Sequence, residues 1–178
     1  MNSPIQSLSQ NAQGMLVLTK FGVLWLFDLT GNDTIKISSV HTSASSNNAV
    51  ITKCIAINDE EILTGGSDGT VKCTSLLNLE QNYEVYKPRK SVKDIVISNG
   101  LMIVAFDNEV CFYGVQSDPM GEKWKYMGVV NFSTSKIASN EKIVGIKNIS
   151  FSDNYFICTN KRLFIIYHHR GSTSNLKV

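Results

Sequence analysis

The chain has 178 residues, of which 43% are hydrophobic and 18% are charged, and its formal net charge is +2. This composition is ordinary for a globular protein, and the near-neutral charge excludes a bulk electrostatic attraction to nucleic acid or to anionic membranes. No apolar stretch approaches the roughly 18 residues of a membrane-spanning helix, and the first 20 residues lack a secretory-signal pattern. We therefore expect a cytoplasmic or nuclear protein with no membrane partner.

Four stretches of the chain share one pattern of strands and turns. They begin at Ser7, Cys54, Asp94 and Asn148. In each stretch an alternating strand is followed by a polar turn, a second apolar strand, a tight turn and a third apolar strand. The runs are short, rich in Val, Ile, Phe, Tyr and Thr, and bounded by Asn, Asp, Gly and Ser, which favours strands over helices. A more polar fourth strand is predicted after each third strand, at residues 35–39, 83–86, 124–130 and 175–178.

The tight turn between the second and third strands sets the register of the repeats. Its first position is occupied in turn by Phe21, Asp68, Asp107 and Asn160, at spacings of 47, 39 and 53 residues. These spacings bracket the roughly 40–45 residues of a propeller repeat, with short inserts added. We predict an all-β chain of about four four-stranded antiparallel repeats. Their approximate bounds are 5–39, 50–87, 91–130 and 144–178, and a flexible Ser/Asn-rich insert is expected at 40–49.

The stretch "LTGGSDGTVKC", residues 63–73, resembles the central signature of a WD-repeat β-propeller blade. The resemblance implies that residues 1–178 form a single partial β-propeller of about four blades. It also implies that four residues hold structural turn positions, namely Asp68, Gly69, Asp107 and Asn160. An all-β sandwich of another topology is the alternative fold.

The sequence departs from the WD-repeat pattern at the Trp-Asp pair and at the Gly-His pair. The tryptophan that ends the third strand in this family is replaced in the four repeats by Phe27, Thr74, Tyr113 and Ile166, and only Asp28 matches the aspartate that follows it. The family's Gly-His pair ahead of the first strand is absent from every repeat, and His41 is expected to lie too far upstream of the second repeat to replace it. The Asp-His-Ser/Thr-Trp network of the family is therefore predicted to be incomplete in every blade.

Four repeats raise the question of how a ring would close, since propellers have four to eight blades. A four-blade arc with the curvature of larger rings leaves open strand edges, which accept further strands. Three explanations remain: the chain is a fragment of a longer product, two copies close a ring of eight, or a partner supplies the missing blades or strands. Residues 164–167 of the last repeat are the strand to which a foreign strand is expected to add.

Residues suited to catalysis or metal binding do not form a recognisable motif. The four cysteines contain no Cys-x-x-Cys pair and lie in apolar runs, so reduced core thiols are expected at Cys54, Cys73, Cys111 and Cys158. His168 and His169 are adjacent on a predicted strand, where successive side chains point to opposite faces. Common nucleotide-binding, hydrolase and zinc motifs are missing from the sequence. We predict that the protein is not an enzyme and has no catalytic residue, metal or cofactor.

The most charged local feature is the basic loop at residues 87–93. Its candidate partner-binding residues are Lys87, Arg89, Lys90 and Lys93. Such a loop suits an acidic protein partner or phosphates. The favoured function is a non-catalytic protein–protein interaction scaffold, with a partner that can also complete the propeller. The alternative is an accessory subunit of an RNA-processing or tRNA-modification complex that contacts RNA through residues 87–93; an enzyme of unknown reaction is the third hypothesis.

Overall fold

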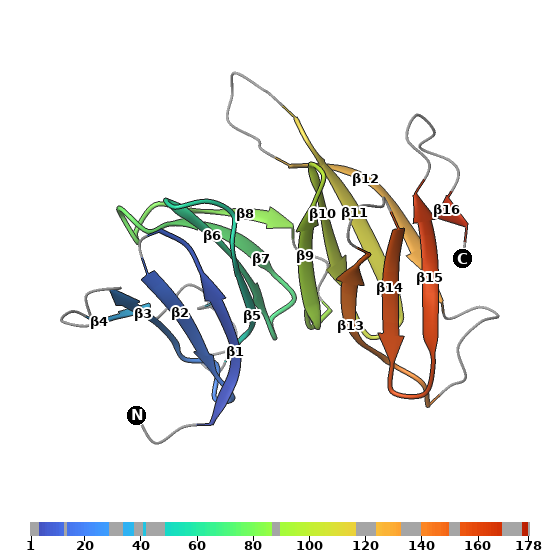
Figure 1. Ribbon diagram of the computed structural model, residues 1–178, viewed down its shortest axis with the longest axis horizontal. Coiled ribbons are helices and arrows are strands. Elements are labelled where there is room, and N and C mark those ends of the chain that lie inside the picture. The colour runs from blue at the N-terminus through green and yellow to red at the C-terminus, as the bar shows by residue number, and fades with distance from the viewer. Residues whose placement is uncertain are drawn as a thin grey trace. The chain divides into compact units, whose positions relative to one another are not determined.

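The computed structural model describes residues 4–12, 14–28, 34–37, 41, 49–86, 90–116, 124–132, 140–149, 154–168 and 176–177. In these ranges all regular secondary structure is β-strand, and the strands form four antiparallel four-stranded sheets (Figure 1). None of the described residues belongs to a helix long and apolar enough to cross a membrane. The chain divides into two compact units, Met1–Val92 and Lys93–Val178, and each contains two of the sheets.

The first unit consists of two antiparallel meanders, in which strands consecutive in sequence are neighbours in the sheet. The first sheet contains β1 (Ile5–Gln10), β2 (Gly14–Thr19), β3 (Leu24–Asp28) and β4 (Thr34–Ile37). The second sheet contains β5 (Ile51–Ala56), β6 (Glu61–Gly66), β7 (Val71–Ser75) and β8 (Asn82–Tyr86).

One apolar core joins the two sheets of the first unit. Alternate residues of a strand share a face, and this places one set of leucines from β2 and β3 against the second sheet. The core side chains are Leu16, Leu18, Leu24, Leu26 and Ile37 from the first sheet, with Ile51, Cys54 and Ile62 from the second. All of them are buried. Burial of this apolar surface is the main favourable term that holds the two sheets together.

The second unit repeats the same arrangement. Its first sheet contains β9 (Asp94–Ser98), β10 (Leu101–Ala105), β11 (Glu109–Val115) and β12 (Trp124–Asn131). Its second sheet contains β13 (Ile143–Asn148), β14 (Asn154–Thr159), β15 (Leu163–His168) and β16 (Leu176–Lys177). The shared core includes Ile103, Val110 and Phe112 from one sheet, and Ile146, Tyr155 and Ile166 from the other.

A buried carboxylate also joins the two sheets of the second unit. Asp94 lies at the start of β9, and its Oδ2 accepts a hydrogen bond of 2.9 Å from the backbone N–H of Ile146 on β13. Its Oδ1 accepts a second bond of 3.0 Å from the N–H of Ile95. The two bonds satisfy donors that are removed from water, which is the condition for burying a carboxylate at tolerable cost.

The observed architecture confirms the predicted fold class, which is an all-β chain of four four-stranded antiparallel blades forming part of a WD-like β-propeller. Each blade is a meander of consecutive strands, and this topology excludes a single two-sheet sandwich. Gly69 and Gly100 lie in hairpin turns and have φ angles of 80° and 75°. Glycine accepts such positive angles without steric cost, which explains its place in these turns. The expected fourth strands correspond to β4, β8, β12 and β16. Of the expected insert at 40–49, only His41 and Ala49 lie among the described residues.

Removal of the Asp94 carboxylate is expected to weaken the second unit. Asp94→Ala should lower the free energy of unfolding by about 1–3 kcal/mol, because the buried N–H of Ile146 loses its acceptor. Asp94→Asn retains an acceptor oxygen and should therefore lower the free energy of unfolding by a smaller amount. The control is Asp59→Ala, which removes an exposed hydrogen bond from the N–H of Ala12. This variant should lower the free energy of unfolding by less than about 0.5 kcal/mol. If urea unfolding showed equal losses of free energy for Asp94→Ala and Asp59→Ala, this would contradict the role of Asp94 in joining the two sheets.

Candidate functional site

The tight turn between β6 and β7 is shaped by Asp68. Its Oδ1 accepts hydrogen bonds from the backbone N–H of Thr70 at 3.1 Å and from the Thr70 hydroxyl at 2.9 Å. The turn is closed by a bond from the N–H of Gly66 to the carbonyl of Thr70. An aspartate that bonds its own backbone two residues on is a common turn-forming device. Asp68 and Gly69 thus lie in the turn where the repeat register puts them.

A buried histidine from the segment ahead of β5 reaches this turn. The Nδ1 atom of His41 is 2.8 Å from Thr70 Oγ1 and 3.3 Å from Asp68 Oδ1. Its Nε2 atom is 2.9 Å from Thr64 Oγ1 on β6. His41, Thr64 and Thr70 are all buried. These three residues and Asp68 form a connected group that we call the His41 network.

One assignment of protons satisfies every contact of the His41 network. The Thr70 hydroxyl donates to the Asp68 carboxylate, so it must accept from His41, which places the ring proton on Nδ1. Nε2 is then an acceptor, and the Thr64 hydroxyl donates to it at 2.9 Å in preference to the Lys72 carbonyl, which lies 3.5 Å away. The other neutral tautomer would leave the bare Nδ1 lone pair facing the carboxylate of Asp68. The chain of donors therefore runs from Thr64 through His41 and Thr70 to Asp68.

Burial favours the neutral form of the histidine in this network. Burial lowers its pKa below the usual 6.5, and this effect exceeds the opposing attraction of the Asp68 carboxylate. A neutral imidazole agrees with the proton assignment, in which only one ring nitrogen donates. The network is enclosed and its members satisfy one another, which identifies it as a structural device.

The expectation that His41 lies too far from the second blade is wrong. The long connection to β5 separates His41 from the blade in sequence, yet the side chain docks on the β6–β7 turn. Three members of the Asp-His-Ser/Thr-Trp network are therefore present in this blade. The tryptophan position holds Thr74, which is buried and whose Oγ1 has no hydrogen-bond partner among the described residues. The network remains incomplete at that one place.

The glycine at position 66, ahead of the turn, is explained by the same network. A Cβ atom on Gly66 would lie 2.1 Å from Asp68 Oδ1 and 2.4 Å from His41 Nδ1. Side-chain atoms of a buried network cannot move far enough to avoid such contacts. Only glycine fits at position 66 while His41 is docked.

The turns of the second unit carry exposed charge in place of a buried histidine. Asp107, in the β10–β11 turn, forms ion pairs with Lys93 Nζ at 3.0 Å and Lys142 Nζ at 3.2 Å. Partial burial opposes the effect, but the two ammonium groups together lower the pKa of Asp107. All three side chains are at least a third exposed to solvent. They form one edge of a polar surface that spans both sheets of this unit.

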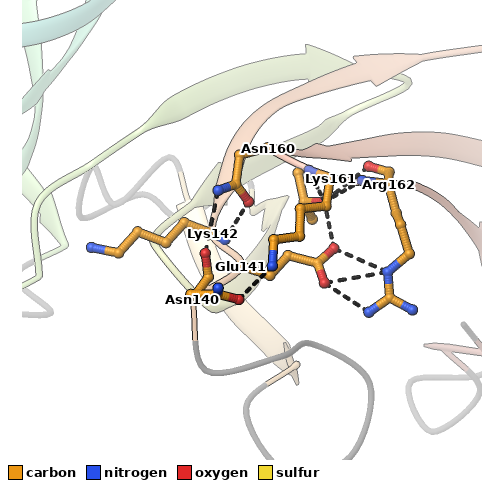
Figure 2. A network of polar contacts seen from close by, with 7 residues as sticks. Asn140, Glu141, Lys142, Asn160, Lys161 and Arg162 are labelled. Carbon is orange, nitrogen blue, oxygen red and sulfur yellow. Dashed lines mark hydrogen bonds and ion pairs between the residues drawn. The ribbon is translucent and has the colours of Figure 1, made fainter.

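The rest of that surface surrounds the β14–β15 turn (Figure 2). Glu141 is buried, and its carboxylate accepts bonds from Arg162 Nη2 at 2.7 Å and from the hydroxyl of Thr159 at 2.6 Å. Asn160 Oδ1 accepts from the backbone N–H of Lys142 at 2.9 Å, and Lys161 donates to the side-chain oxygen of Asn140. We call this surface the polar rim, comprising Lys93, Asp107, Asn140, Glu141, Lys142, Asn160, Lys161 and Arg162. It is the candidate functional site.

The predicted partner-binding residues fall in different places. Lys87 and Arg89 lie outside the described residues, so the basic loop at 87–93 stays a prediction. Lys90 is exposed in the first unit, and Lys93 belongs to the second unit, where Asp107 balances part of its charge. Asp107 and Asn160, predicted as turn residues, both belong to the polar rim.

Sequence reasoning missed Glu141 and Arg162. They lie 21 positions apart, and no short motif links a glutamate ahead of a first strand to an arginine ahead of a third. A faint signal exists, since His41 and Glu141 are both polar residues ahead of a blade's first strand that reach that blade's tight turn. Only the structure shows that the two positions correspond.

Other features of the described structure are weaker candidates for a functional site. The side chains of His168 and His169 lie outside it, and no group of three His, Cys, Asp or Glu within it is placed to hold a metal ion. A shallow hollow on the first sheet is lined by Met15, Val17, Phe27 and Asp28. The described cysteines are free thiols, and Cys158 is the least buried of them.

No family model matches the sequence, and no curated protein matches it. Solved structures do match the fold. The β-propeller domain of Myceliophteria thermophila Cps50 (Swd1) has a TM-score of 0.74 at 10% identity, over 97% of this chain and 59% of that one. The WD40 β-propeller domain of Doa1 has a TM-score of 0.67 at 14% identity, over 97% of this chain and 53% of that one. A chain of the mitotic checkpoint complex has a TM-score of 0.67 at 13% identity, over 98% of this chain and 51% of that one.

These comparisons show the fold alone. The chain has the fold of WD40-type β-propellers, and it spans between half and three-fifths of the length of the three similar chains. At identities of 10–14%, the resemblance lies in the strand pattern and not in matching side chains.

The neutral state of His41 predicts how stability depends on pH. In the unfolded chain histidine has a pKa of about 6.5, whereas burial lowers it in the folded protein. The unfolded state therefore binds the proton more strongly, and the free energy of unfolding should decrease as the pH falls below about 6.5, until the folded pKa is passed. His41→Gln should be less stable at neutral pH but less sensitive to pH over this range. Urea unfolding at several pH values checks this, and parallel curves for both proteins would contradict it.

Gly66→Ala tests the packing of the network. The added methyl group should push His41 or Asp68 out of place and lower the free energy of unfolding by more than about 2 kcal/mol. The matched control is Gly128→Ala on β12, where an added Cβ meets no atom within 4 Å. The control should be neutral or slightly stabilising, since alanine reduces the freedom of the unfolded chain. A Gly66→Ala variant as stable as the control would show that His41 is not docked.

Proposed function

We propose that this chain is a non-catalytic scaffold, a WD-repeat-like subunit that holds other proteins together in a cytosolic or nuclear complex. The polar rim is the observation that carries the proposal. It presents charged and amide side chains on turns that are anchored to two packed blades. Its buried part, the contact of Glu141 with Thr159 and Arg162, is internally satisfied and holds the turn in one conformation. A prearranged polar surface on a rigid support is well suited to recognition, because little ordering is needed on binding.

The charges of the polar rim favour an acidic partner. Four cations, on Lys93, Lys142, Lys161 and Arg162, are set against two carboxylates, on Asp107 and Glu141. The Lys142 side chain is 61% exposed and that of Arg162 is 52% exposed. Complementary charge at such a surface speeds association and selects partners more than it adds affinity. The fold supports a protein partner, since one chain of similar fold is part of the mitotic checkpoint complex.

The same excess of cations supports a second candidate function. In this alternative the chain is an accessory subunit of an RNA-processing or tRNA-modification complex, and it contacts phosphates through residues 87–93. Lys93 belongs both to that loop and to the polar rim. Phosphate contacts make binding strongly dependent on salt, whereas a protein contact of mixed character depends on it less.

Affinity capture with and without nuclease separates the two functions. We expect one or two stoichiometric proteins that remain bound to the tagged chain after nuclease treatment. The double variant Lys142→Glu, Lys161→Glu should reduce their recovery by about tenfold or more, because the charge of the rim is reversed. The control is Lys20→Glu, Lys36→Glu, at exposed positions of the first unit. Loss of all bound material after nuclease, together with a steep salt dependence, would overturn the scaffold function in favour of RNA.

A further inference from the structure

A partly exposed serine lies between two cations just ahead of the third blade. Lys90 directly precedes Ser91, and Lys93 follows it two positions later. Both lysines are exposed. The Ser91 hydroxyl has no hydrogen-bond partner among the described residues. Unlike the buried threonines of the His41 network, this hydroxyl therefore takes no part in holding the fold and is available to react.

The two residues that follow Ser91 are fixed by backbone hydrogen bonds. Val92 is buried, and its N–H donates to the carbonyl of Gly66 at 3.2 Å. The N–H of Lys93 donates to the carbonyl of Ala105 at 2.8 Å. Ser91 itself belongs to no strand. A group added to Ser91 therefore breaks no strand pairing, and the fixed backbone beside it keeps that group close to Lys93.

Lys93 links this segment to the polar rim. Its Nζ is 3.0 Å from Asp107 Oδ1, and Lys142 Nζ is 3.2 Å from Asp107 Oδ2. Ser91 and Lys93 are two residues apart, so their Cα atoms are separated by at most about 7 Å in any conformation of the segment. This is less than the screening length of about 8 Å at physiological ionic strength. A charge placed on Ser91 therefore acts on the ammonium group of Lys93.

Cations beside a hydroxyl form a pattern that one class of protein kinase selects. Kinases discriminate between substrates by the charges around the hydroxyl that they modify. Lys90 and Lys93 place one cation on each side of Ser91. The nearest acidic residue in sequence, Asp94, is buried and accepts a hydrogen bond from β13. The segment therefore presents positive charge to an enzyme that approaches Ser91.

We propose that Ser91 is phosphorylated by a protein kinase that selects basic segments, and that the phosphate switches off the polar rim. This proposal rests on the scaffold function and adds its regulation. In the reaction, the Ser91 oxygen attacks the γ-phosphorus of ATP. A new P–O bond forms as the bond from this phosphorus to the oxygen of ADP breaks, and the serine proton passes to a base of the kinase.

The charge of one phosphate is large enough to cancel that of the rim. Four cations of the polar rim are set against two carboxylates, and a phosphoserine carries about −1.5 to −2 charges at neutral pH. A lysine is attracted more strongly to such a group than to a single carboxylate, so Lys93 should turn from Asp107 to the phosphate. The rim then has little excess positive charge with which to attract an acidic partner.

Treatment of the full chain with a kinase of this class and Mg·ATP tests the site. Mass spectrometry of the peptides should find Ser91 as the main phosphorylated residue. The paired variant Lys90→Gln, Lys93→Gln should lower the rate by about tenfold or more. The matched control is Lys125→Gln, Lys147→Gln, at exposed positions of the second unit, and it should not change the rate. An unmodified Ser91, or a rate that the paired variant leaves unchanged, would overturn the proposal.

The pKa of Asp107 reports whether Lys93 moves. In the unmodified protein two ammonium groups lower this pKa, so withdrawal of Lys93 and the added negative charge should both raise it. An NMR titration of the Asp107 carboxyl group in the phosphorylated chain measures the change. Ser91→Gln adds a polar side chain without charge and should leave the pKa of Asp107 as it was. A pKa that phosphorylation does not raise would overturn the switch.

Binding of a labelled poly-glutamate peptide to the full chain measures the effect on the rim. Phosphorylation and Ser91→Glu should each weaken binding by about tenfold or more at low salt, because the positive charge is cancelled. Ser91→Gln should bind as the unmodified chain does. The difference should shrink as the salt concentration rises, since salt screens these charges. Equal affinities of the phosphorylated and unmodified chains at low salt would overturn the switch.

Affinity capture distinguishes failure of the switch from failure of the scaffold function. If the unmodified chain captures no stoichiometric partner, the scaffold function itself fails. If the phosphorylated chain retains the partners of the unmodified chain, the switch fails and the scaffold function stands. Partners that are released from the phosphorylated chain but kept by Ser91→Gln support both.

Discussion

Apolar side chains on both faces of the middle strands are the constraint on which this structure depends. In the first blade, Leu16 and Leu18 of β2 face the second sheet, whereas Met15 and Val17 lie on the opposite face. An apolar face of a sheet is stable in water only when it is covered. Stacking two meanders face to face within each unit meets this requirement for the face that carries Leu16 and Leu18, whereas Met15 on the other face of the first sheet is 40% exposed. Many combinations of aliphatic and aromatic residues satisfy it, and the fold is therefore shared with WD40-type propellers at identities of only 10–14%.

The segments that precede the first strands of the second and fourth blades are held to these blades by polar contacts, and these contacts differ between the two units. In the second blade, His41 docks on the turn of Asp68 as a neutral ring, and the whole network is buried. In the fourth blade, Glu141 docks on the equivalent turn, but its partner Arg162 is half exposed. The first arrangement uses its polar groups for internal structure. The second leaves cations and amides at the surface, and this difference places the candidate recognition site in the second unit.

Local patterns made most of the architecture predictable. Alternating apolar residues and Asp-Gly or Asn-Gly turns act over a few positions, so the strands and hairpins around Gly69 and Gly100 could be read directly. Contacts across a long connection could not. His41 is separated from its blade by the segment to Ile51, and Glu141 and Arg162 acquire a meaning only once β14 and β15 are paired.

Thiol reactivity tests the face-to-face packing of blades most directly. Cys54 lies in the core between the first two sheets, where burial raises its pKa to about 12, whereas Cys158 on β14 is partly exposed. Alkylation of the native protein at mildly alkaline pH, followed by mass spectrometry of each peptide, measures both rates in one sample. The packing predicts that Cys158 reacts readily while Cys54 reacts only on unfolding, at least about 100-fold more slowly. Equal rates at the two thiols would show that the first two sheets do not cover each other, and would contradict the propeller arrangement.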